Sequence, residues 1–180
     1  MLRRILVAAV VVVGAVAAVI ASRPSEFRVA RATTIAAPPA VVFAQINDFH
    51  KWETWNPWGK MDPGMKQSYE GEPAGVGAVY RWSGNNEVGE GRMTIVESRP
   101  NQQVKVQLEF HKPFAATSLA TFTLMPQGIN QTLVTWSMEG QNNFMAKAVH
   151  MVMNMDTMIG GQFEKGLAAM RTAAEAAAKS

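Results

Sequence analysis

The feature that most constrains the fold is an apolar stripe in the C-terminal segment, residues 143–179. Its members recur at steps of three and four residues: Phe144, Ala148, Met151, Met155, Ile159, Phe163, Leu167, Met170 and Ala174. This spacing predicts an amphipathic helix. A helix of about thirty residues would be roughly 45 Å long, so the rest of the chain must supply a broad apolar surface against its stripe.

Two features predict an irregularity within this helix. Each glycine of the pair Gly160-Gly161 costs about 1 kcal/mol inside a helix, and Asp156 is a favourable N-cap residue. We therefore expect a kink or a loosened turn between Asn154 and Gly161. Methionines gather just before it, at positions 145, 151, 153, 155 and 158. Because methionine is flexible and polarizable, they suit either core filling or one wall of an apolar ligand cavity.

The middle of the chain alternates with the period of β-strands. Val104, Val106, Leu108 and Phe110 are separated by polar residues, which predicts a strand with one buried face. The same pattern places Tyr80 with Trp82, Met93 with Ile95, and Val134 with Trp136 and Met138, on buried faces. Turn residues such as Gly84-Asn85-Asn86 and Pro100-Asn101 separate these strands. The pattern predicts an antiparallel meander of five or six strands, whose apolar face is covered by the C-terminal helix.

The segment before the meander predicts shorter elements. Residues 27–35 suggest a first strand with a basic outer face, and residues 38–47, which begin with two prolines, suggest a short helix. A further helical turn is expected at residues 50–54.

The first residues are directed to a membrane. Residues 5–21 contain no charged or strongly polar side chain. The length of this apolar run is at the lower limit for a membrane span. The segment 1–22 is therefore interpreted as an uncleaved signal-anchor, with a cleaved secretory signal as the alternative, because Ala15-Val16-Ala17 offers small residues for cleavage. We expect one domain, residues 23–180, on the extracytoplasmic side, either membrane-anchored or released after cleavage.

Several motifs resemble those of the polyketide cyclase-like branch of the SRPBCC, or START/Bet v 1, superfamily. They are residues 34–43, 46–49, 51–58, 89–95 and 163–167. The resemblance covers residues 27 to about 179. It implies an α+β helix-grip fold, in which a curved antiparallel sheet of six or seven strands wraps around a long C-terminal helix, with two short helices after the first strand. It also implies apolar or amphipathic small molecules between sheet and helix, and, in some members, cyclisation or dehydration.

Composition and motifs exclude several kinds of chemistry. The chain has no cysteine, which removes disulfides and thiolate catalysis, and its three histidines lack metal-ligand spacing. The net charge of +3 is scattered rather than gathered in a stripe, so we expect no nucleic-acid partner. No catalytic constellation is visible. We expect no metal and no cofactor, and the sequence does not indicate an oligomeric state.

Three hypotheses for function follow. The first is binding of a lipid, isoprenoid or aromatic polyketide-like molecule. The second is a cyclase or dehydratase-like enzyme, which needs a buried ionisable group beside the cavity. The third is a non-catalytic interaction or stress-response module with a filled core. The predicted ligand-binding residues are Tyr80, Trp82, Met93, Ile95, Val106, Leu108, Phe110, Trp136, Met151, Met155, Ile159 and Phe163.

Polar and aromatic side chains add further candidates. Trp52, Trp55 and Trp58 are expected either to cap the open end of the sheet or to form the mouth of a cavity. Glu90 or Arg92 would enter the cavity only if their strand is bulged. Asp156 and His150 are weaker candidates for polar groups at the cavity.

Overall fold

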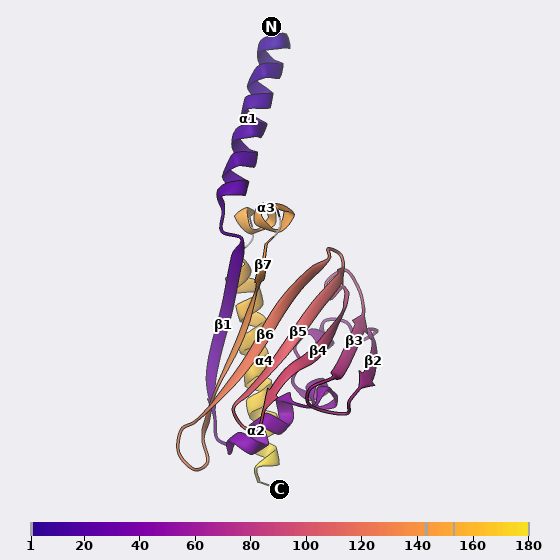
Figure 1. The fold of residues 1–180 in the computed structure, drawn as a ribbon, viewed down its shortest axis with the longest axis vertical. Coiled ribbons are helices and arrows are strands. Elements are labelled where there is room, and N and C mark those ends of the chain that lie inside the picture. The colour runs from indigo at the N-terminus through magenta and orange to yellow at the C-terminus, as the bar shows by residue number, and fades with distance from the viewer. Residues whose placement is uncertain (1, 143, 153, 180) are drawn as a thin grey trace.

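The structure is a computed structural model that describes the backbone of residues 2–142, 144–152 and 154–179. It confirms the helix-grip fold. One curved antiparallel sheet has the strand order β1-β7-β6-β5-β4-β3-β2, and helix α4 lies along its concave side (Figure 1). The strands are β1 (Glu26–Ile35), β2 (Lys66–Gly71), β3 (Ala78–Ser83), β4 (Glu90–Arg99), β5 (Gln103–Lys112), β6 (Ala116–Pro126) and β7 (Thr132–Gln141).

The short elements between β1 and β2 also follow the prediction. Helix α2 (Pro39–Ile46) begins with a proline, whose fixed φ suits the first turn and whose missing N–H is not needed there. The 3₁₀ helix η1 (Phe49–Thr54) is capped by Asp48, which accepts a hydrogen bond from the His50 N–H at 2.9 Å. A shorter 3₁₀ helix, η2 (Trp58–Lys60), follows.

The C-terminal segment forms two helices rather than the one kinked helix predicted. Helix α3 (Phe144–Val152) and helix α4 (Met155–Ala177) are separate, and α3 lies across the direction of α4 (Figure 1). Asn154, not Asp156, is the N-cap of α4, because its side-chain oxygen accepts from the Thr157 N–H at 3.1 Å. The break predicted between Asn154 and Gly161 therefore lies at the start of that range, at Asn154, and helix α4 continues without interruption through Gly160 and Gly161.

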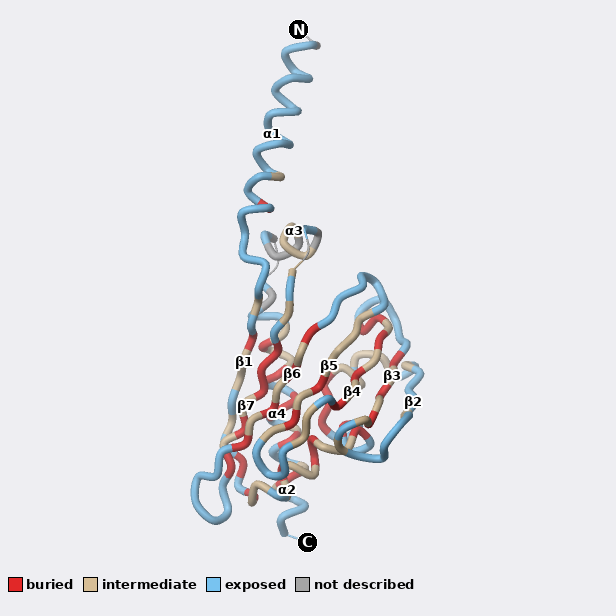
Figure 2. The backbone as a smooth tube through the Cα atoms, viewed as in Figure 1, coloured by how far each residue is buried: buried red, intermediate tan, exposed pale blue. Residues whose placement is uncertain are grey.

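The core lies between the concave face of the sheet and α4. Buried residues concentrate there, whereas α1 is exposed along almost its whole length (Figure 2). The inward side chains of α4 are those of Phe163, Leu167, Met170 and Ala174, each at most 2 % exposed. Strand β6, whose sequence is apolar on both sides, buries alternate residues from Ser118 to Leu124.

The first strand departs from the prediction at one basic residue. Arg28 is exposed, but Arg31 reaches the helix side of the sheet and contacts α4. Its guanidinium group forms salt bridges with Asp156 at 2.9 Å and Glu164 at 2.7 Å. This cluster fixes the start of α4 against the edge strand β1.

Helix α1 (Leu2–Ser22) stands apart from the sheet (Figure 1). Its residues 3–22 are long and apolar enough to cross a membrane, with a mean hydropathy of 2.9, a property that signal sequences share. The last turn of α1 contacts α3: Ile20 is buried, and the Lys147 ammonium group donates a hydrogen bond to the Ala21 carbonyl at 3.3 Å.

Candidate functional site

Two of the three loop tryptophans belong to the core. Trp52 is 5 % exposed and Trp55 is fully buried. Their indole N–H groups donate to the Ile46 and Gln45 carbonyls at 2.9 and 3.1 Å. These carbonyls lie in the last turn of α2, where the helix leaves acceptors unpaired. The two indoles therefore hold α2 to η1.

A cavity of about 300 Å³ lies between the sheet, the segment around η1 and η2, and α4. Nearly all of its wall is apolar. The residues that line it are Trp52, Asn56, Trp58, Met65, Tyr80, Trp82, Glu87, Val88, Gly89, Met93, Leu108, Phe110, Lys112, Pro113, Ala120, Trp136, Met138, Ile159 and Phe163. The volume of the cavity lies at the lower end of the range for small-molecule sites.

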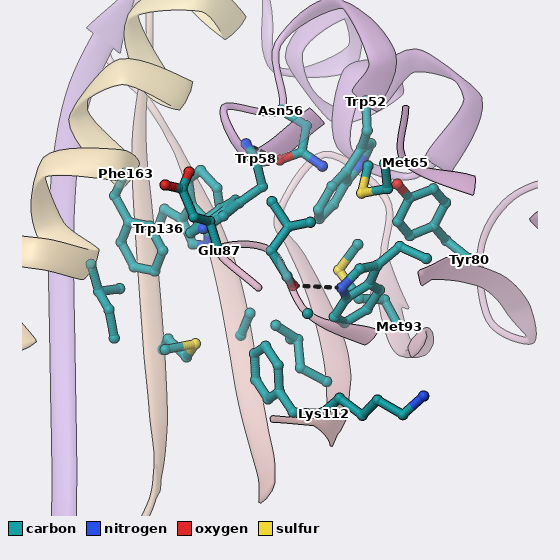
Figure 3. A pocket seen from close by; sticks show the side chains of 18 of the residues that line it. Trp52, Asn56, Trp58, Met65, Tyr80, Glu87, Met93, Lys112, Trp136 and Phe163 are labelled. Atoms are coloured by element: carbon teal, nitrogen blue, oxygen red, sulfur yellow. Dashed lines mark hydrogen bonds between the residues drawn. The ribbon is translucent and has the colours of Figure 1, made fainter. Parts of the chain in front are cut away.

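Stacked aromatic rings form the wall nearest to α4. The Trp136 ring of β7 lies parallel to that of Phe163, with 4.2 Å between the ring centroids, and Trp58 meets Trp136 edge to face at 5.8 Å (Figure 3). Gly166 permits this arrangement, since a Cβ atom there would come within 2.8 Å of Trp136 Cζ3. The missing side chain lets α4 approach the sheet closely.

The opposite wall depends on another glycine. Trp82 of β3 is paired with Gly91 of β4, and a Cβ atom on Gly91 would lie 2.6 Å from Trp82 Cη2. The indole therefore lies across β4. Its N–H donates to the Val88 carbonyl at 3.0 Å, the bond drawn in Figure 3. That bond ties the turn between β3 and β4 to the wall, and this turn also brings Glu87 to the cavity rim.

Few ionisable groups reach the cavity. Glu87 is exposed, and Lys112 directs its ammonium group away from the cavity (Figure 3) to Glu90, at 2.9 Å. Tyr80 is 5 % exposed, and burial, with a smaller contribution from the charge of Glu53, raises its pKa to about 12. Its hydroxyl group is therefore protonated at neutral pH. Among the described residues, none of the cavity carboxylates or amines is buried.

Most of the residues predicted to bind a ligand lie around this one cavity. They are Tyr80, Trp82, Met93, Leu108, Phe110, Trp136, Ile159 and Phe163. The alternation of apolar residues in the strands and the stripe of α4 identify them, because both patterns point to the space between the sheet and the helix. Their contact with a ligand stays a prediction.

Three predicted residues, Ile95, Val106 and Met151, are not among the residues that line the cavity. Ile95 and Val106 are fully buried in the hydrophobic core. Met151 is 45 % exposed because α3 turns away from the sheet. The side chain of Met155 lies outside the part of the structure that is described. The predicted methionine wall is thus wrong for Met151, and it is replaced by Met65, Met93 and Met138 from other elements.

Three of the predicted polar candidates, Glu90, Arg92 and Asp156, do not line the cavity. The register of β4 does shift between Glu90 and Gly91, yet neither Glu90 nor Arg92 enters the cavity. Both point outward, Glu90 to Lys112 and Arg92 to Glu109 at 2.9 Å. Asp156 binds Arg31, and the side chain of His150 lies outside the described residues.

Sequence reasoning missed several lining residues. Asn56 lies in a segment without periodicity, so no pattern assigns it a face. Trp52 and Trp58, which were expected either at the open end of the sheet or at the mouth of a cavity, both line the cavity. Val88, Gly89 and Pro113 lie in turns, where no periodic pattern assigns a side chain to a face. Ala120 belongs to β6, where both faces are apolar. Across the residues searched, no group of histidine, cysteine and acidic side chains could hold a metal ion.

The fold and its internal apolar cavity define this chain as a helix-grip protein of the Bet v 1-like type. A family model for polyketide cyclase/dehydrase and lipid transport matches residues 26–175. The chain belongs to this family. No curated protein sequence matches it.

Solved structures share the fold at low sequence identity. A protein from Thermobifida fusca has a TM-score of 0.62 and 21 % identity, over 80 % of this chain and 90 % of that one. A norcoclaurine synthase point mutant from Thalictrum flavum, in complex with a transition-state analogue, has a TM-score of 0.61 and 14 % identity, over 87 % and 96 %. The Aha1 dimer from Colwellia psychrerythraea has a TM-score of 0.59 and 15 % identity, over 83 % and 96 %. At these identities the likeness shows the fold alone.

Proposed function

We propose that the domain binds an apolar or amphipathic small molecule, such as a lipid, isoprenoid or aromatic compound, in the cavity between the sheet and α4. The observation that carries this proposal is the cavity of about 300 Å³ with an almost entirely apolar wall. Transfer of apolar surface from water to such a wall supplies about 25 cal/mol per Å². The volume suits one ring system or one chain rather than a large double-chain lipid.

Two observations favour binding over the alternatives. Catalysis of cyclisation or dehydration needs an acid or base at the substrate, and Tyr80, with its pKa raised to about 12, is the one buried ionisable group among the described lining residues. The cavity argues against a module with a filled core, because part of the interior is not packed. We further propose that α1 holds the domain at a membrane surface, where apolar ligands are concentrated, with the domain on the extracytoplasmic side.

The experiment uses a cavity-filling variant with a matched control. Ala120 is 3 % exposed and lines the cavity, whereas its neighbour Thr121 is only half-buried and lies on the other face of β6. Ala120→Leu adds bulk inside the cavity, and Thr121→Leu adds it outside. The full chain and both variants are purified under identical conditions, and their bound small molecules are extracted and measured by mass spectrometry.

We expect the wild type and Thr121→Leu to carry the same molecule at similar occupancy, and Ala120→Leu to carry severalfold less. Melting temperatures show whether each variant is folded. Equal occupancy in Ala120→Leu, or a wild-type protein that carries nothing and binds no added naphthalene probe, would contradict the proposed function.

A further inference from the structure

Large apolar side chains are exposed on α3 and on the adjoining end of the sheet. Phe144 and Met151 of α3 are 49 % and 45 % exposed, and Phe114, in the turn between β5 and β6, is 63 % exposed. Phe144 and Met151 are separated by seven positions, which places them on one face of the helix. Apolar side chains that gather at one end of a molecule are characteristic of a protein or membrane contact.

The register of the sheet places these side chains and one end of the cavity together. β1 begins opposite the last residue of β7, and β7 ends beside the first residues of β6. The first residues of β6 pair with the end of β5, which pairs with the start of β4. The α1–β1 junction, α3 and the β3–β4 and β5–β6 turns therefore lie at the same end of the domain (Figure 1). Both turns contribute residues to the cavity, Glu87, Val88 and Gly89 from one and Pro113 from the other.

Helix α1 determines what lies next to this end. Its residues 3–22 form a helix of 20 residues, roughly 30 Å long at 1.5 Å per residue, which matches the hydrocarbon core of a bilayer. The last turn of α1 contacts α3, where Ile20 is buried and the Lys147 ammonium group donates to the Ala21 carbonyl at 3.3 Å. In Figure 1, α3 lies crosswise at that end of α1. An α1 that spans a bilayer therefore places α3 at the bilayer surface, roughly in the plane of the membrane.

We propose that this end of the domain is a membrane-contacting surface: Phe144 and Met151 of α3, together with Phe114, enter the interface of the phospholipid bilayer that α1 spans. The turn-lined end of the cavity then faces lipid, and an apolar molecule passes between bilayer and cavity with little exposure to water. This inference rests on the proposed function, in which α1 anchors the domain. A helix that lies in the interface buries its apolar face at the boundary of headgroups and acyl chains.

The charges at this end indicate an apolar contact rather than an electrostatic one. Arg23, Arg28 and Lys112 are exposed there, and so are Glu26 and Glu139. Because charges of both signs are present, attraction to anionic lipids is weak. The contact should therefore form on an uncharged phosphatidylcholine surface.

The test measures which side chains reach the lipid. Because the chain contains no cysteine, single labelling positions are created one at a time by Phe144→Cys, Met151→Cys and Phe114→Cys. Ile129→Cys is the matched control, since Ile129 is 90 % exposed in the turn between β6 and β7, at the opposite end of the sheet. Each full-length variant is labelled with a nitrobenzoxadiazole fluorophore and reconstituted into phosphatidylcholine vesicles, with and without lipids that carry a nitroxide quencher.

A fifth label separates the contact from the anchor on which it depends. Gly14 lies within α1, and a side chain there meets nothing within 4 Å. A fluorophore on Gly14→Cys reports whether α1 is inserted, because nitroxides deep in the acyl chains quench it only in that case. The cavity's bound molecules are measured on the same wild-type preparation, and melting curves verify that each labelled variant is folded.

We expect lipid nitroxides to remove most of the fluorescence at positions 14, 114, 144 and 151 and to leave position 129 unchanged. Quenching at position 14 with none at positions 144 and 151 would overturn the inference and leave the proposed function standing. A blue-shifted emission at position 144 without quenching would mean that protein, such as a second copy of the chain, covers this face, and it would overturn the inference as well. An unquenched label at position 14 would remove the anchor and the inference together. A wild-type cavity that carries nothing contradicts ligand binding, whatever the labels show.

Discussion

Gly160 of α4 lies directly against the guanidinium group of Arg31 in β1, in a position where any Cβ atom would overlap it. That guanidinium group is held by Asp156 and Glu164 and also donates to the Asp156 carbonyl at 3.1 Å. The neighbouring Gly161 has open space around it, because a Cβ atom there would meet nothing within 4 Å. A methyl group is therefore sterically excluded at Gly160 and permitted at the adjacent Gly161.

We predict that the two alanine substitutions have opposite signs. Gly161→Ala should stabilise the protein by up to about 1 kcal/mol, because alanine loses less backbone entropy than glycine in a helix. Gly160→Ala should destabilise it, by roughly 1–3 kcal/mol as overpacking does, because the methyl group displaces Arg31. Denaturant unfolding of both variants measures this. Stabilisation by Gly160→Ala would show that Arg31 moves aside without loss.

The Asp156–Arg31 pair predicts a dependence of stability on pH. The hydrogen bond from Arg31 lowers the pKa of Asp156 below its ordinary value. A lowered folded-state pKa adds stability above about pH 4, the range of an unfolded aspartate, and this stability is lost as the pH falls through the folded-state pKa. Asp156→Asn should therefore reduce the difference in melting temperature between pH 6 and pH 3. Glu26→Gln, at an exposed residue without a salt bridge among those described, should leave that difference unchanged.

The tryptophans predict graded losses of stability. Trp136→Ala and Trp55→Ala should each cost roughly 3–5 kcal/mol, the range for truncating a large buried aromatic side chain, because both are at most 3 % exposed. Trp58→Ala should cost clearly less, since Trp58 is half-buried at the cavity. Equilibrium unfolding of the three variants gives the values. A loss at Trp58 equal to that at Trp136 would mean that the cavity wall is as tightly packed as the core.

Removal of residues 1–22 should leave the domain folded. Helix α1 contacts α3 at its last turn, and its buried residue is Ile20, outside the cluster that forms the core. We expect the truncated chain to show a cooperative melt and to move from the membrane fraction to the soluble fraction. Circular dichroism and fractionation measure both. Aggregation without a cooperative transition would show that α1 is part of the folded unit.

Periodicity predicted the parts of the fold that depend on burial of a repeating face. The stripe from Phe163 to Ala174 is buried as predicted. In β5, Val104 and Val106 are buried, and Leu108 and Phe110 are partly buried and pack against the core. N-terminal to Asn154 the stripe gave a wrong prediction of one continuous helix. Phe144 and Met151 continue its spacing, but the chain changes direction there. Spacing describes a face; it does not show where a helix begins, which a single capping side chain decides.

The apolar strand and helix residues of the candidate cavity could be predicted from the sequence, but the lining residues from turns and from the aperiodic segment could not. Trp136 and Phe163 follow from strand and helix patterns. Trp58 was expected either at the end of the sheet or at the cavity mouth, whereas Asn56 lies in an aperiodic segment and no pattern places it in the wall. Arg31 shows a further limit, since the basic residues of β1 were expected on its outer face, whereas Arg31 lies on the helix side and binds Asp156 and Glu164 of α4.

The strand order has a consequence for how the chain folds. β1 is the first strand to be synthesised, yet its partner in the sheet is β7, with residues 26–35 opposite residues 132–141. Contacts between such distant segments make folding slow. On the ribosome β1 therefore waits as an unpaired edge while the β2–β6 meander can already pair. The sheet closes only after β7 has been synthesised, and α4 can dock on it only after residues 155–177 have followed, so the β1 edge stays exposed while the meander is being made.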